Sequence, residues 1–289
     1  MKQVIINADD FGLSRGINLG IIRAHTEGIV TSTSAVVNGK FFDEGVDLLK
    51  KTPSLGTGIH LNLTLGKPLL PKNLCKTLID SDGCFSSYSR FIRRVLLKRI
   101  DPGEIKKELQ KQIERFLETG LSCSHIDTHK HIGYIPLVLD IILELAEEFR
   151  IRRVRFPNEV RIFPGSVYLK SLFDRDTMMS FFVSYLTKKT GTRLAQKRMA
   201  HPEYFFGISR AGFTEKDNPY LSYLKTCKEG INEIMCHPSA MEEHPSVGYG
   251  RYGLKRRYQE LQELTDPELK KIILQGRLKT ISFHDIPVP

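Results

Sequence analysis

The sequence predicts an α/β fold with parallel strands. Short apolar segments typical of strands alternate with amphipathic segments of helical length, a pattern characteristic of βαβ units. The chain has 289 residues, a length at which α/β barrels commonly form one unit. We therefore expect a single domain over residues 1–289, with insertions at about 66–102 and 160–200, where the alternation breaks.

The first three strands are expected at residues 4–7, 30–38 and 56–64, where apolar and β-branched side chains concentrate. Apolar residues at helical spacing predict a first helix capped by Ser14 and a second at residues 41–51. The same criteria predict later helices at 102–120 and 135–149, and later strands at 123–127, 153–157, 231–235 and 278–282.

Composition limits the classes of function. No stretch approaches the roughly 20 apolar residues that span a bilayer, and no secretory signal precedes the first strand. The five cysteines form no CxxC pair, which favours a reducing, cytoplasmic compartment. The net charge of +10 suits anionic partners. Because zinc-finger, RNP-like and helix-turn-helix motifs are absent, no nucleic-acid partner is expected.

Membrane-surface contact is one interpretation of the basic insertions. Residues 91–97 alternate apolar and basic side chains, as a helix lying on a membrane does, and the stretch after Ser166 is also aromatic and basic. This interpretation predicts a lipid-linked substrate and a protein peripheral to the inner membrane face. The alternative is that these helices pack on the domain and expose solvated arginines.

Adjacent carboxylates, Asp9 and Asp10, follow the apolar segment at residues 4–6. Consecutive side chains of a strand point to opposite faces, so both can face one site only where the chain turns, and Gly12 gives the chain that freedom. Two carboxylates in one site require a cation. A divalent ion bound by Asp10 would leave Asp9 free to take a proton from water.

Histidines in three later segments supply further candidate ligands. His60 alternates with Asn62 on one face of a predicted strand, as a pocket lining does, and His237 follows another strand as a candidate general acid. Four residues from 125 to 131 share parity but extend over about 20 Å, so they cannot all reach one ion. Some must orient ligands or contact substrate. These four are His125, Asp127, His129 and His131.

One Asp and two His with open positions suit a divalent ion that activates water for hydrolysis, although non-haem iron oxygenases use the same set. A free Asp9 and an acidic His237 favour hydrolysis, which needs one base and one acid.

The sequence resembles the YdjC-type carbohydrate deacetylases, which include chitooligosaccharide deacetylases and deacetylases associated with hopanoid lipid biosynthesis. Five motifs carry the resemblance, in the family's order and over most of the chain. They are NADDFGLS at residues 7–14, VTSTS at 30–34, GIHL at 58–61, HIDTHKH at 125–131 and MCHP at 235–238. Residues 66–102 and 160–200 match poorly.

The resemblance implies a distorted (β/α) TIM-like barrel with its active site at the carboxyl ends of the strands. It also implies removal of the acetyl group from an N-acetylated amino sugar with one divalent ion, zinc or magnesium. Asp10, His60 and His129 match the metal ligands, Asp9 the general base and His237 the general acid.

Two further positions of the resemblance concern the rim of the site. Arg155 matches a basic position that touches substrate or orients Asp9. Gly133 stands where the family often has another histidine, a departure that affects the substrate rim and leaves the three ligands intact.

Two other functions stay open at this point. One is a different metal-dependent hydrolase on the same barrel, an esterase or a phosphoesterase. The other is a basic protein that binds membranes or nucleic acid and retains a vestigial metal site. A homodimer is a further expectation, whereas the length of the sugar and the nature of any carrier cannot be predicted.

Overall fold

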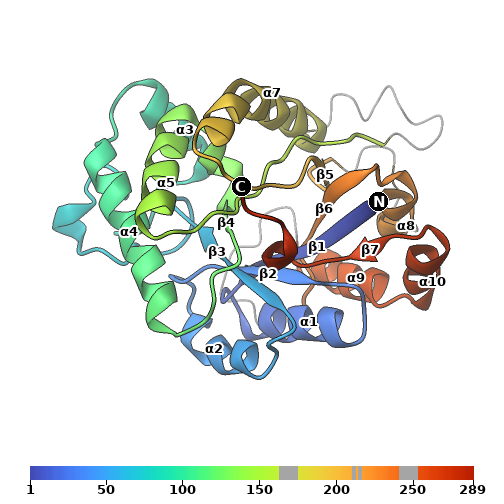
Figure 1. The fold of residues 1–289 in the computed structure, drawn as a ribbon. Coiled ribbons are helices and arrows are strands. Elements are labelled where there is room, and N and C mark those ends of the chain that lie inside the picture. Colours follow the sequence, from blue (N-terminus) through green and yellow to red (C-terminus); the bar gives the residue numbers. More distant parts are fainter. Residues whose placement is uncertain (163–174, 210–212, 214–216, 241–252) are drawn as a thin grey trace.

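The computed structural model describes the chain except residues 163–174, 210–212, 214–216 and 241–252 (Figure 1). Within the described residues, seven parallel strands form a curled sheet in the order β4-β3-β2-β1-β6-β5, and β7 also pairs with β1. Helices surround this sheet on its outer side (Figure 1). The architecture confirms the predicted α/β distorted barrel.

The strands are β1 (Lys2–Phe11), β2 (Ser32–Ala35), β3 (Gly56–Leu61), β4 (Ile126–Thr128), β5 (Tyr204–Phe206), β6 (Gly230–Cys236) and β7 (Lys279–Thr280). The helices are α1 (Arg15–Thr26), α2 (Phe42–Lys50), α3 (Tyr88–Leu96), α4 (Pro102–Glu118), α5 (Pro136–Glu148), α7 (Arg175–Gln196), α8 (Pro219–Thr226), α9 (Leu254–Leu264) and α10 (Pro267–Gln275). The described residues also form three short 3₁₀ helices: η1 (Lys72–Leu74), η2 (His129–Tyr134) and η3 (Phe283–Asp285).

Helix α1 illustrates how local sequence determines the outer layer. The hydroxyl of Ser14 accepts a hydrogen bond from the backbone N–H of Ile17 at 3.1 Å, which confirms the predicted cap. Ile17, Ile21 and Ala24 lie on one face of the helix and are buried. The predicted helices at 41–51, 102–120 and 135–149 are also confirmed, as α2, α4 and α5.

The predicted strand at 153–157 is wrong as a continuous strand. Its residues form isolated bridges instead, from Val154 to Ile126 and from Arg153 to Ala200, and farther along Glu159 is bridged to Phe205 of β5. Pro157 has no N–H to donate, which limits regular pairing. These bridges place the segment between β4 and β5, so it closes the barrel and brings its side chains into the interior.

The interior of the barrel has an apolar layer on the side of the amino-terminal ends of the strands, which we call the lower side. Side chains of β1 alternate: Val4 and Ile6 pack outward with the main core, whereas Ile5 belongs to a separate buried cluster. The segment that follows β7 crosses the middle of the ring of strands in Figure 1 and completes this cluster. We call the cluster the interior floor; its members are Ile5, Ala200, Ile231, Ile281, Phe283 and Ile286.

The first insertion is held to the barrel by polar side chains of α4. Gln112 accepts a hydrogen bond from the backbone N–H of Asn62 at 2.9 Å and donates one to its carbonyl at 2.8 Å. Glu108 accepts hydrogen bonds from the backbone N–H groups of Leu69 and Leu70, both at 3.0 Å. These buried side chains replace the backbone partners that the loop lacks.

Helix α3 contains the basic stretch for which membrane contact is one interpretation. Phe91 is buried, and Arg94 donates hydrogen bonds to the carbonyls of Thr77 and Ile79 and pairs with Asp80 at 3.2 Å. Leu96 and Leu97 are exposed. Within the described part of the chain, no helix is long and apolar enough to cross a bilayer.

Candidate active site

The two aspartates of β1 face the same cavity because the strand is irregular between them. The register with β2 shifts between Ala8 and Phe11, and Asp10 has a φ of 73°, in the left-handed region that non-glycine residues rarely adopt. Gly12, at a φ of 96°, continues the turn. The predicted turn therefore begins at Asp10 itself, inside the strand. Strained backbone of this kind is typical of functional sites.

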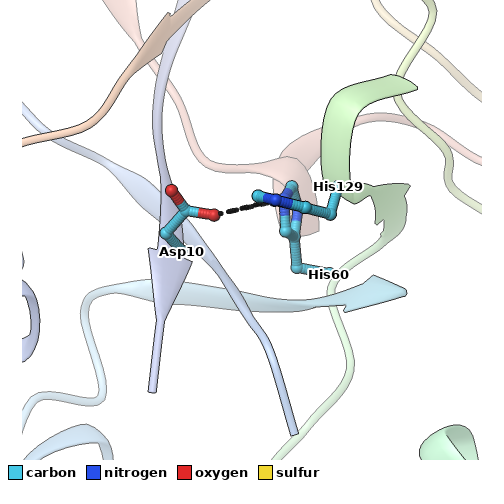
Figure 2. Close-up of side chains that lie close together, drawn as sticks. All are labelled: Asp10, His60 and His129. Atoms are coloured by element: carbon cyan, nitrogen blue, oxygen red, sulfur yellow. Dashed lines mark hydrogen bonds and ion pairs between the residues drawn. The ribbon is translucent and has the colours of Figure 1, made fainter. Parts of the chain in front are cut away.

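Asp10, His60 and His129 form a compact group of candidate metal ligands at the carboxyl ends of β1, β3 and β4 (Figure 2). One ligand atom from each residue lies within 4.8 Å of the others. Asp10 Oδ1 is 3.1 Å from Nδ1 of His129 and 3.6 Å from Nε2 of His60. One carboxylate oxygen and two imidazole nitrogens are a donor set that suits zinc and other divalent first-row metals.

A carboxylate behind His60 determines which ring nitrogen faces the group. Asp127 Oδ1 lies 2.7 Å from Nδ1 of His60, so Nδ1–H donates to Asp127 and Nε2 is turned toward Asp10. Although burial opposes the charged ring, Asp127, Asp9 and Asp10 raise the pKa of His60 to about 9. The concentration of negative charge that causes this shift also favours a bound cation.

Asp9 is held ionised by the buried guanidinium of Arg155. Nη1 of Arg155 donates to Asp9 Oδ2 at 2.7 Å and Nη2 donates to Oδ1 at 2.6 Å, a bidentate pair. Burial alone would raise the pKa of Asp9, but the charge and hydrogen bonds of Arg155 lower it far below its usual value. Asn7 donates a further hydrogen bond to Asp9 Oδ1 at 2.9 Å.

Arg155 also bonds to two further buried carboxylates, those of Asp127 and Glu233. Its Nη1 is 2.9 Å from Asp127 Oδ2, and its Nε donates to Glu233 Oε1 at 2.7 Å. The backbone of Arg155 is fixed as well, because its carbonyl accepts a hydrogen bond from the hydroxyl of Tyr134 and its N–H donates to Ile126. All three carboxylates around the guanidinium are buried.

Helix α9 adds charged side chains on the opposite side of Asp10. Nη2 of Arg257 is 2.5 Å from Asp10 Oδ2, which leaves Oδ1 facing the histidines. Burial would raise the pKa of Asp10, but Arg257 and the two histidines hold it well below its usual range. Glu260 Oε2 accepts the backbone N–H of His237 at 2.6 Å, and burial lowers the pKa of the His237 ring.

The structure separates the remaining candidate residues from the ligand group. His125 lies at the floor, its ring stacked on Phe283 with centroids 3.7 Å apart, and burial lowers its pKa to about 3. His131 packs edge-on against Phe205, with centroids 5.9 Å apart. Asn62 donates through its side chain to Asn38 Oδ1 and to the carbonyl of Leu65.

A change of backbone conformation breaks the shared parity of the 125–131 segment. The strand ends at Thr128, and Lys130 and His131 then adopt left-handed φ values of 54° and 55°. His131 consequently leaves the face shared by the earlier residues and packs on Phe205, whereas His129, which precedes the change, lies against Asp10.

Sequence reasoning assigned no role to five residues that contact the site: Asn7, Ser34, Glu233, Arg257 and Glu260. A signal existed for Glu233, a charged residue inside an apolar strand, which is costly unless paired. A polar face of β2 was a signal for Ser34, whose hydroxyl donates to Asp127 Oδ2 at 2.9 Å. Arg257 and Glu260 lie on a helix of ordinary charged composition that offers no comparable signal.

The chain matches the family model of YdjC-like proteins over residues 3–275. This chain belongs to the YdjC-like family. A relative from Brevibacillus brevis named carbohydrate deacetylase is 34% identical over 284 residues, which cover 98% of this chain and 99% of the relative. Relatives with the same name from Clostridium beijerinckii and Vibrio cholerae are 32% and 31% identical and cover 98% and 99% of this chain, and 100% and 94% of the relatives themselves.

A solved structure also matches the family fold. A protein of Enterococcus faecalis described as a cellobiose-phosphate cleavage protein superimposes with a TM-score of 0.74 at 26% identity. The match covers 98% of this chain and 97% of that protein. The predicted resemblance to the YdjC-like family is therefore confirmed over nearly the whole chain.

Proposed function

We propose that this YdjC-like protein is a metal-dependent hydrolase that removes the acetyl group from an N-acetylated amino sugar. The observation that carries the proposal is the juxtaposition of three potential metal ligands with a separately paired, ionised carboxylate. Asp10, His60 and His129 are the proposed ligands, and Asp9 is the proposed base. The name carbohydrate deacetylase, borne by relatives that cover nearly the whole chain, supports the same class of reaction.

The donor set fits one divalent ion, zinc or magnesium, and its two imidazoles favour zinc. When bound, such an ion polarises the amide carbonyl and makes a neighbouring water more acidic. His60 is oriented for this task by Asp127, and Asp10 by Arg257.

The proton transfers are assigned to two residues of this chain. Asp9 stays ionised because Arg155 pairs with it, so it can accept the proton of the attacking water. A carboxylate has about four lone-pair directions, so Asp9 can accept this proton while it is bonded to Arg155. His237 gives a proton to the departing amine nitrogen, and the lowered pKa of its ring makes the protonated form a stronger acid.

The finer predictions about the substrate stay predictions. A lipid carrier, membrane-surface contact and a homodimer have no support from the names of the relatives, which specify only a carbohydrate. An esterase or phosphoesterase reaction is the second candidate, because the same ligands and base serve it equally well.

The test is acetate release from N-acetylglucosamine oligomers, with and without chelator, in wild type and in Asp9→Asn. We expect metal-dependent release, reduced roughly 10²- to 10⁴-fold in Asp9→Asn because the amide cannot accept the proton. Asp43→Asn is the matched control, since Asp43 lies on α2 in an exposed pair with Arg115. Metal-loaded protein that cleaves esters or phosphoesters but releases no acetate from the oligomers would overturn the proposal.

A further inference from the structure

The guanidinium of Arg155 contacts more carboxylates than its charge can balance. Asp9, Asp127 and Glu233 all bond to it at 2.6 to 2.9 Å, and each is almost completely buried. His60 pairs with Asp127 on its other side, so Arg155 and a protonated His60 would face three ionised carboxylates and leave one uncompensated negative charge in the barrel. Buried charge of that size is costly enough that one carboxylate is expected to take up a proton.

The surroundings of Glu233 distinguish it from the other two carboxylates. Both oxygens of Asp9 bond to Arg155, and Asp127 receives His60 on one oxygen and Arg155 and Ser34 on the other. Glu233 has one bonded oxygen, Oε1, whereas no described residue donates a hydrogen bond to its buried Oε2. An ionised carboxylate needs donors on both oxygens far more than a neutral acid does.

The strands beside Glu233 provide no further cation. Its register partners are Ile5 on β1 and Phe205 on β5, both apolar. The titratable groups that face it are Arg155 from the closing segment, Asp9 from β1, Asp127 from β4, Tyr134 from η2 and Cys236 from its own strand. Of these only Arg155 is positively charged.

We infer that Glu233 is a protonated positioning residue: a neutral acid that holds Arg155 through Nε and leaves the guanidinium charge to Asp9 and Asp127. Its proton is on Oε2, because Oε1 accepts from Arg155. Burial, as the dominant cause, raises the pKa of Glu233 to about 8 despite Arg155, which agrees with this assignment. The inference deepens the proposed function, because it explains how Asp9 stays the ionised base while three carboxylates share one cation.

Two substitutions test whether the neutral form is the working form. Glu233→Gln keeps an oxygen that accepts from Arg155 Nε and resembles the protonated acid, so kcat/KM should stay within about threefold of wild type. Glu233→Ala removes that acceptor and frees Arg155 to move, so kcat should fall at least about tenfold while KM changes little. Equal losses in both variants would show that the negative charge is required and would overturn the inference.

Two measurements without catalysis separate this inference from the proposed function. Infrared spectra at pH 7 should show a carboxylic-acid carbonyl band in wild type that disappears in Glu233→Gln and is retained in Asp9→Asn. Its absence from the wild-type minus Glu233→Gln difference would contradict the inference even if the protein is a deacetylase. If the band is present but no acetate is released, the proposed function fails while the inference stands.

The pH dependence of stability supplies the second measurement. If Glu233 keeps its proton up to about pH 8 in the folded state and loses it near 4.5 when unfolded, the folded state binds one more proton between these values. Stability then falls as pH rises through this window. The Tm of wild type should therefore fall by a few degrees relative to that of Glu233→Gln between pH 5 and pH 8. A rise instead would show that Glu233 is ionised.

Discussion

The interior floor and the polar layer directly above it are built on the same strands but are stabilised by different interactions. On β1, Ile5 belongs to the floor, and the next two side chains on the same face, Asn7 and Asp9, belong to the polar layer. On β6, Ile231 and Glu233 repeat the change. The floor is held by apolar burial, which tolerates changes of shape, whereas the layer above depends on each charge keeping its partner.

This difference teaches where stability and function are separable in the barrel. Conservative substitutions in the floor should alter the free energy of unfolding and leave the site intact. Substitutions in the polar layer should alter the site and the stability together, because its residues share bonds.

The largest effect is expected from Arg155→Met. Removing the guanidinium leaves Asp9 and Asp127 buried without their cation, which should cost about 3–5 kcal/mol of stability and abolish acetate release. Urea unfolding and activity of the remaining folded protein measure the two effects. A stable, active variant would show that the polar layer does not depend on this residue.

Phe283→Ala should have a similar effect on stability and none on the site. The buried ring stacks on His125 and packs in the floor, so its loss should lower the free energy of unfolding by about 3–5 kcal/mol. Metal affinity and kcat per folded molecule should stay within about twofold of wild type. Loss of metal binding in folded protein would show that the floor and the polar layer are not independent.

Asp127→Ala should weaken metal binding and destabilise the fold together, because Asp127 is bonded to both His60 and Arg155. Without the carboxylate, His60 loses the acceptor that fixes its tautomer, and affinity should fall roughly 10- to 100-fold. Competition with a chromogenic chelator measures the change. The control is Asp140→Ala, which breaks an exposed pair with Arg193 on α5 and α7 and should bind metal like wild type.

The smallest effect on stability is expected from His125→Phe, and it should appear only at acidic pH. Burial lowers the pKa of His125 to about 3, against about 6.5 when unfolded, so the unfolded state binds the extra proton between these values. The contribution of the neutral His125 ring to the free energy of unfolding is therefore fully present above pH 6.5 and is lost as the pH falls toward 3. Between pH 7 and pH 5, wild type should lose about 2 kcal/mol more than His125→Phe. Parallel pH profiles would show that His125 is not a buried neutral ring.

Much of the fold was predictable from the sequence, and each element that was predicted wrongly has an identifiable cause. The parallel α/β arrangement and the main helices followed from periodicity, because apolar spacing directly reflects which face is buried. The closing segment around Arg155 was predicted as a strand and forms bridges, since pairing depends on partners distant in sequence. The strands β2 and β3 end earlier than predicted, because polar side chains and turns end them at the site, whereas β4 begins three residues later than predicted.

Part of the candidate site was also predictable from the positions of its residues relative to the predicted strands. Asp9, Asp10, His60 and His129 lie at or just beyond the carboxyl ends of strands, so their convergence could be inferred from the rule that parallel strands end together. The position of His131 against Phe205 could not, because it depends on the left-handed backbone after His129. Strand β5 and helices α8 to α10 were also not predicted, being short or of mixed composition.

The interior floor has a consequence for the order of events during synthesis. Ile5 is made more than 270 residues before Ile281, Phe283 and Ile286, with which it packs. Until then, the nascent barrel has no lower layer and its charged interior stays accessible to water from below. Contacts of such long sequence separation are slow to form. We therefore expect the proposed metal site to become competent only after residues 279–286 have been added and have packed on Ile5, so that acquisition of the ion is a late step in folding.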